Sequence, residues 1–191
     1  MQKIDQREIV LPETKPETEW LRGRAVQKVS PKRKHGEVQL WLGARLREWA
    51  RGRGRVASEW RFRIAPPGEV IRPLVPDISY LAYDRMLGAS AEDWETPLVP
   101  PTVAIEIRSP DDRRADLDDK IATLLRAGTE LIVVVNSRTR TVTCCDNGGR
   151  RELGEQDTLT HRVLPGFSLS LAEMFAEIDF DPDKRRVQPP K

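Results

Sequence analysis

The sequence predicts an α/β (α+β) fold, in which helices flank a mixed β-sheet. Three observations support this fold class. Residues 103–108, 113–127 and 130–135 have the patterns of a strand, a helix and a strand, which implies a right-handed crossover between parallel strands. The strand-like segments on either side of this unit look like hairpins, which adds antiparallel strands. The length of 191 residues, of which 38% are hydrophobic, suits one domain with its own core.

The domain is expected to span residues 19–178, between an N-terminal tail at 1–18 and a C-terminal tail at 179–191. The first tail carries two prolines and no periodicity, so it is either loose or an arm along an edge of the sheet. Residues 19–30 predict a hairpin with Gly23 at its turn. A polar loop follows, and then a helix at 37–50. Its apolar positions are spaced by about one helical turn and are Val38, Leu42, Leu46 and Trp49.

The middle of the chain predicts strands separated by turns. Gly52 and Gly54 end the helix, and residues 56–64 form one strand with alternating polar and apolar positions. A turn region after this strand has the composition of a hairpin tip. Residues 78–83 form the next strand. An acidic loop at 84–101, with or without a short helix, leads to the 103–108 strand.

The 103–108 strand is almost continuously apolar, which indicates a central position in the sheet. The following helix has an apolar stripe, and Gly128 is a suitable C-cap. Ser170 is the expected N-cap of the last helix. The remaining strands and helices are predicted at residues 130–135, 138–145, around 158–163 and 170–178.

The net charge of +2 hides an uneven distribution of charged residues. Between residues 20 and 64 there are thirteen Lys and Arg residues, and the only acids are Glu37, Glu48 and Glu59. Such a basic segment would suit a polyanionic partner such as nucleic acid. A solvated arginine-rich surface is the alternative.

Composition also sets limits on the class of protein. No run of 18 apolar residues exists, so no membrane span is expected. The first residues lack an apolar signal region, so we expect a cytoplasmic protein. Cys144 and Cys145 are adjacent and have no second pair, so they are interpreted as reduced strand residues.

Asp77 and Glu106 are the strongest candidates for a functional site. Each lies in an apolar, strand-like run, where a carboxylate is costly to bury unless it is paired or binds a cation. Two carboxylates on neighbouring strands would suit Mg²⁺ or Mn²⁺. Asp77 could instead be a strand-start residue after proline, and Glu106 could form a buried salt bridge with Arg108.

Lys120 lies at the edge of the apolar stripe of the predicted 113–127 helix. If that helix packs on the sheet, the lysine could reach the carboxylates and steady the attacking hydroxide or the charge on a phosphate. The alternative is a surface pair with Asp116 one turn earlier. His35 lies in the predicted basic loop and could contact phosphate or simply be solvated.

The order of several short segments resembles the Uma2 family of the PD-(D/E)XK nuclease-like superfamily. These segments are EWLRG, PDISY, VAIEIRSPD, DLDDK and AGTELIVV, and they span about residues 19–175. The resemblance implies a restriction-endonuclease-like fold with motif residues Glu19, Asp77, Glu106 and Lys120. Asp77 and Glu106 are implied as metal ligands, Glu19 as an auxiliary acid, and Lys120 as the catalytic lysine.

The chain also departs from the family pattern. Arg22 and Arg24 stand in the first hairpin, where family members are usually more acidic. Arg108 stands where the superfamily has a lysine two residues after the strand glutamate. Arginine is not a base at neutral pH, but it can bind phosphate through two hydrogen bonds. Arg108, His35 and Lys34 are therefore our candidate phosphate contacts.

The resulting expectation is a Mg²⁺- or Mn²⁺-dependent endonuclease that hydrolyses phosphodiester bonds in DNA. A homodimer would suit the cleavage of two strands. Two other classes remain open. One is a catalytically inactive module of the same fold that binds nucleic acid or protein. The other is an oligomer-forming protein that uses its five tryptophans at an interface.

Overall fold

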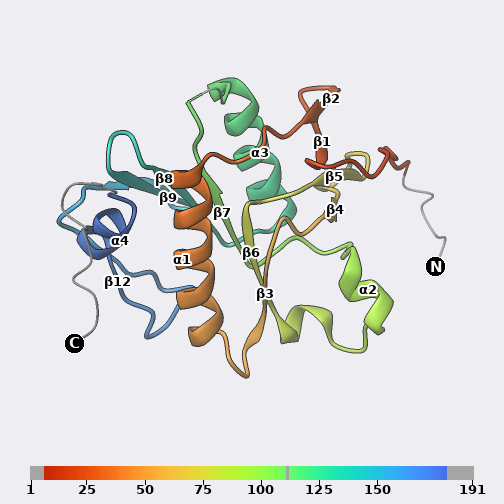
Figure 1. Cartoon of the computed structure of the whole chain (residues 1–191). Coiled ribbons are helices and arrows are strands. Elements are labelled where there is room, and N and C mark those ends of the chain that lie inside the picture. Colours follow the sequence, from red (N-terminus) through yellow and green to blue (C-terminus); the bar gives the residue numbers. More distant parts are fainter. Residues whose placement is uncertain (1–6, 111, 180–191) are drawn as a thin grey trace, which may run out of the picture.

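The computed structural model describes residues 7–110 and 112–179 and is built around one six-stranded mixed sheet (Figure 1). Strands β7 and β8 are parallel and are connected through helix α3. The other pairs in the sheet are antiparallel. This topology confirms the predicted fold class and crossover. In spatial order the strands are β10 (Gly149–Leu153), β9 (Thr141–Asp146), β8 (Leu131–Asn136), β7 (Val103–Ile107), β6 (Ile78–Ala82) and β3 (Gly54–Ser58).

Helices cover both faces of the sheet (Figure 1). Helices α1 (Arg33–Trp49) and α4 (Leu171–Glu177) pack on one face, and α3 (Arg114–Ala127) packs on the other. In β7, Ile105 belongs to the core under α1 and α4, whereas Ala104 belongs to the core under α3. Because side chains alternate along a strand, Glu106 faces α3. The central strand therefore directs its one carboxylate toward the helix that bears Lys120.

Two small hairpins lie on the α3 side of the sheet. One pairs β1 (Thr18–Leu21) with β2 (Arg24–Gln27), and the other pairs β4 (Phe62–Ile64) with β5 (Arg72–Leu74). The described part of the N-terminal tail runs beside the second hairpin, where Ile71 bonds to the backbone on both sides of Glu8. The remaining elements are η1 (Tyr83–Met86), α2 (Ala91–Glu95), β11 (Thr158–Leu159) and β12 (Leu169–Ser170).

Two predicted elements have other bounds in the structure, and one strand was missed. Helix α1 begins at Arg33 rather than at residue 37, so the predicted loop residues Lys34 and His35 lie in its first turn. The predicted 56–64 strand is divided into β3 and β4, because Glu59 takes a positive φ of 50° between them. Strand β10 was missed, because four of its five residues are exposed and show no apolar alternation.

The tryptophans and cysteines have structural roles within the chain. Trp41 and Trp49 pack against the core under α1, and Trp60 and Trp94 pack against the core under α3. These four side chains are therefore used inside the molecule, which weakens the interpretation of an oligomeric interface built from tryptophan. The two cysteines are free and lie in strand β9, as predicted, and both are buried. None of the helices in residues 7–110 and 112–179 combines the length and the hydrophobicity that a membrane-spanning helix needs.

Candidate active site

The sheet register brings Asp77 and Glu106 together. Ile78 pairs with Ile105 in the antiparallel β6–β7 ladder. Continuing this register by one residue places Asp77 opposite Glu106. Directly opposite residues of antiparallel strands lie on the same face of a sheet and about 5 Å apart. Asp77 also accepts a 2.6 Å hydrogen bond from the backbone N–H of Ile107, which fixes its carboxylate at the end of β7.

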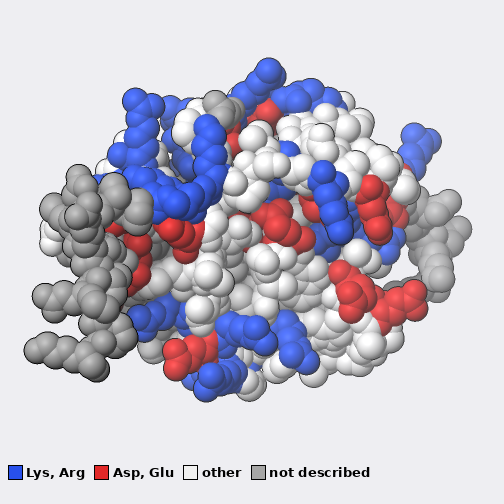
Figure 2. Space-filling model, in the orientation of Figure 1, with Lys and Arg blue, Asp and Glu red and all other residues white. Residues whose placement is uncertain are grey.

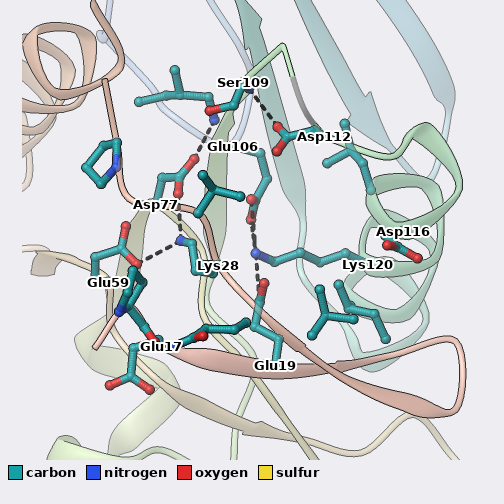
Figure 3. Close-up of a pocket in the computed structure, with 18 of the residues that line it drawn as sticks. Glu17, Glu19, Lys28, Glu59, Asp77, Glu106, Ser109, Asp112, Asp116 and Lys120 are labelled. Carbon is teal, nitrogen blue, oxygen red and sulfur yellow. Dashed lines mark hydrogen bonds and ion pairs between the residues drawn. The ribbon is translucent and has the colours of Figure 1, made fainter. Parts of the chain in front are cut away.

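Lys120 links Glu106 to Glu19 (Figure 3). Its Nζ lies 2.8 Å from Glu106 Oε1 and 2.7 Å from Glu19 Oε1. It also donates a 2.9 Å hydrogen bond to the carbonyl of Val75, whose N–H donates to Glu19. The lysine is only 3% exposed, so these contacts hold it rigidly. The four residues named by the family resemblance thus meet in one buried cluster.

Lys28 is a second lysine of this cluster, and the sequence analysis did not single it out. It follows β2, and its Nζ lies 2.6 Å from Asp77 Oδ1 and 2.8 Å from Glu59 Oε2. It donates to the same Val75 carbonyl as Lys120, at 3.1 Å. The strand period was an available signal, because Lys28 shares a face with Val26, which pairs with Glu19.

The cluster carries more negative than positive charge. Four carboxylates (Glu19, Glu59, Asp77 and Glu106) face the ammonium groups of Lys28 and Lys120. Burial raises the pKa of Glu106 to about 8, against the attraction of Lys120. Burial opposes the charged form of Asp77 as well, but the positive charges of Lys28 and Lys120 outweigh it and lower the pKa of Asp77.

The lysines themselves are strongly held in their charged form. Burial alone would lower the pKa of each ammonium group. For Lys28 the charges of four nearby carboxylates, led by Asp77, together outweigh burial and raise its pKa. For Lys120 the charges of Glu106, Glu19 and Asp77 together do the same. Both lysines are therefore cations at neutral pH, which excludes either of them as a ready general base in this state.

The carboxylates line a cavity of about 630 Å³, a size that suits a small ligand or a segment of a polymer. His35 stands at its wall, with Nε2 3.7 Å from Asp77 Oδ2 and Nδ1 3.4 Å from the hydroxyl of Ser109. Arg108 also lines this cavity. Lys34 is exposed and is not among the residues of the cavity wall. Of the three candidate phosphate contacts, His35 and Arg108 thus reach the cavity.

Two alternative interpretations from the sequence are corrected by these contacts. Lys120 does not form a surface pair with Asp116, because it is buried among Glu19 and Glu106. Asp116 instead accepts a 2.6 Å hydrogen bond from Arg24. Glu106 pairs with Lys120 rather than with Arg108.

The two arginines that depart from the family pattern attach the first hairpin to α3. Arg24 bonds to Asp116, and the backbone N–H of Arg22 donates to Asp119 at 3.0 Å. Both acids lie on α3, the helix that carries Lys120. This docking fixes the distance between Glu19 on the hairpin and Lys120 on the helix.

The donor chemistry of the cluster fits a divalent metal, but only after a rearrangement. Among the described residues, no three His, Cys, Asp or Glu side chains converge into a ready metal site. However, Glu106 Oε1 is buried and makes no well-directed hydrogen bond within the described residues. Hard carboxylate oxygens and an excess of negative charge are what Mg²⁺ and Mn²⁺ prefer. Asp77 would have to release Lys28 in order to bind the metal.

The basic segment does not form one continuous positive surface. Figure 2 shows basic and acidic side chains interleaved over much of the visible face. Arg61 and Arg63 are paired with Glu17 and Glu8 of the N-terminal arm. A separate exposed group lies at the turn from α1 to β3, seen as basic side chains at the lower edge of Figure 2. Its members are Arg47, Arg51 and Arg55, which make no ion pair within the described residues.

Comparisons with known proteins bear on the family and the fold of the chain. The model of the Uma2 family, described as "Putative restriction endonuclease", matches residues 4–172. The structure is similar to a crystal structure of a "putative nuclease belonging to DUF820 from Anabaena variabilis ATCC 29413", with a TM-score of 0.77 and 24% sequence identity. The match covers 88% of this chain and 94% of that chain, so the fold is shared over nearly the whole domain. No curated protein matches the chain.

Proposed function

This chain belongs to the Uma2 family, and from that premise we propose that it is a divalent-metal-dependent endonuclease acting on DNA. The observation that carries the proposal is the cluster in which Glu19, Asp77, Glu106 and Lys120 line one cavity. Buried carboxylates beside a fixed lysine are the groups that metal-assisted phosphodiester hydrolysis requires. The family match makes hydrolysis of nucleic acid the natural use of these groups.

In the proposed reaction, Asp77 and Glu106 would hold Mg²⁺ or Mn²⁺. The bound ion would supply a more acidic water and neutralise charge on the scissile phosphate. Lys120 keeps Glu106 and Glu19 in place and holds a permanent positive charge beside the reacting phosphate. His35 and Arg108, on the cavity wall, bind the phosphate oxygens.

Cleavage of supercoiled plasmid in the presence of Mg²⁺ or Mn²⁺ tests this proposal. We expect Glu106→Gln and Asp77→Asn each to reduce the rate by about 100-fold or more, the scale of losing a principal electrostatic contact in a reaction. Glu48→Gln is the matched control, because Glu48 is exposed on α1 outside the cavity wall and should leave the rate unchanged. Circular dichroism would verify that each variant is folded.

The proposal fails if the wild type does not nick the plasmid, or if Glu106→Gln nicks as fast as the wild type. A second candidate function would then apply. The ion pairs of Asp77 with Lys28 and of Glu106 with Lys120 favour a module that binds DNA without cutting it. That module would bind labelled duplex DNA without cleaving it, and its binding would weaken as salt is added.

A further inference from the structure

The two lysines of the cluster differ in how firmly they are held. Lys120 is 3% exposed and bonds to two buried carboxylates and one carbonyl. The side chain of Lys28 is 15% exposed, and one of its two carboxylate partners, Glu59, is itself 40% exposed. Figure 3 shows Lys28 between Asp77 and Glu59, and Lys120 enclosed between Glu106 and Glu19. Lys28 is therefore the ammonium group that can move.

The position of Lys28 is also the one that a metal ion would need. Its Nζ lies 2.6 Å from Asp77 Oδ1, the oxygen that does not bond to Ile107. The other Asp77 oxygen is occupied by a backbone N–H that holds strand β7. A cation that binds Asp77 through Oδ1, and so leaves the bond to Ile107 intact, would lie beside the Lys28 ammonium group, and the two positive charges would repel each other.

Glu59 gives Lys28 a partner to retain when it leaves Asp77. The Glu59 carboxylate already contacts Lys28 at 2.8 Å and lies toward the solvent side of the cluster. Because the cluster holds four carboxyl groups and only two ammonium groups, a bound divalent ion would offset its negative charge if Lys28 stayed paired with Glu59. The flexible four-carbon stem of lysine permits such a movement.

We infer that the Lys28 ammonium group competes with the divalent metal for Asp77. Metal binding would displace this group from Asp77 and leave it paired with Glu59 alone. Lys28 thus sets the metal affinity of the site, whereas Lys120 stays in place in both states. This inference rests on the proposed function for the identity of the metal position. It assigns to Lys28 a role in cation selection that acts before any substrate binds.

Isothermal titration calorimetry with Mn²⁺, in the absence of DNA, tests the competition. Lys28→Met should bind Mn²⁺ about ten- to a hundredfold more tightly than the wild type, the range expected from removing one charge-assisted hydrogen bond. Lys15→Met removes the same charge from the wall of the same cavity without a described contact to Asp77. It should change the affinity less than about threefold, since an exposed charge is screened.

A charge-neutral double variant separates direct competition from a general change in potential. Lys28→Met with Glu59→Gln removes one charge of each sign and leaves no stranded carboxylate at position 59. It should still bind Mn²⁺ more tightly than the wild type. An affinity equal to or below that of the wild type in both the single and the double variant would overturn the inference.

A measurement on the unaltered chain avoids any dependence on the folding of the variants. The side-chain ammonium signals of ¹⁵N-labelled lysine can be followed by NMR while Mg²⁺ is added. We expect the Lys28 signal to shift or broaden as Mg²⁺ saturates the site, while the Lys120 signal persists. An unchanged Lys28 signal at saturating Mg²⁺, or the loss of Lys120 instead, would refute the transfer.

The outcomes separate this inference from the proposed function. Tighter Mn²⁺ binding by Lys28→Met, without plasmid cleavage by the wild type, would support the competition and reject the nuclease. Plasmid cleavage by the wild type, without tighter binding by Lys28→Met, would support the nuclease and reject the competition.

Discussion

At the scale of single residues, the raised pKa of Glu106 makes one contribution to stability depend on pH. Its folded pKa of about 8 lies above its ordinary value of 4.5, because burial disfavours the charged form. The folded chain therefore holds a proton that the unfolded chain releases between these two values. Stability from this group is present at low pH and is lost as pH rises through the folded pKa.

We predict that Glu106→Gln flattens this decline in the metal-free protein. In the wild type, the contribution of Glu106 should fall by up to about 1.4 kcal/mol per pH unit within the window. In the variant, whose amide does not titrate, this slope should disappear. Urea denaturation at several values between pH 5 and 8 in the presence of a chelator measures it, and identical slopes for both proteins would contradict the prediction.

The candidate residues themselves were largely predictable, and the reason is local. Asp77 and Glu106 stand out because each interrupts an apolar strand. Their partners were harder to identify, because an ion pair depends on which elements pack together. Lys28 was one of thirteen basic residues in its segment, and only the docking of the first hairpin against the sheet distinguishes it.

At the scale of elements, the first hairpin positions two members of the site. Its turn places Arg22 and Gly23 at positive φ values of 49° and 75°. Glu19 lies before this turn and Lys28 lies after it. The tight turn therefore fixes the register that brings both side chains to the cavity.

Replacing the turn glycine with alanine should destabilise the protein, whereas replacing a helical glycine with alanine should stabilise it. Gly23→Ala forces a β-carbon into the left-handed region and should cost about 1 kcal/mol of unfolding free energy. Gly43→Ala lies inside α1 with open space around the new carbon, and it should add about 0.5–1 kcal/mol. Thermal or urea denaturation compares the two, and a stabilising Gly23→Ala would exclude the proposed role of the turn.

The limits of sequence prediction also lie at this scale. The β7–α3–β8 crossover was correctly predicted because its apolar periods are long and its cap is a glycine. The first turn of α1 was missed because Lys32, Arg33 and Lys34 offer no apolar face and no capping side chain. Strand β10 was missed because its exposed edge position imposes no alternation.

At the scale of the whole molecule, the exposed arginines of the α1–β3 turn lie far from the cavity. Helix α1 has 17 residues and is therefore about 25 Å long, with His35 in its first turn and Arg47 in its last. A duplex that reached both ends would be held along most of one side of the domain. Such contact would be directed at phosphates and would not depend on base sequence.

If DNA follows this path, the salt dependence of its binding should report these arginines. Changing Arg47, Arg51 and Arg55 together to Gln should reduce the slope of log K against log salt by up to about 3, close to one for each lost phosphate contact. Arg61→Gln with Arg63→Gln is the control, because these arginines already bind Glu17 and Glu8. Fluorescence anisotropy with labelled duplex DNA measures the slope for each variant. If the triple variant has the same slope as the wild type, these three arginines do not contact the DNA.

The exposed loop between β6 and β7 divides the candidate site along the chain. Leu87, in the first part of this loop, is 83% exposed, so the chain could be cut there at the surface. The N-terminal piece would carry Glu19, Lys28 and Asp77, and the C-terminal piece would carry Glu106 and Lys120. Neither piece alone holds the full set of side chains. The site can therefore form only where the two pieces associate, so a chain divided in this loop would make its assembly depend on whatever holds the pieces together.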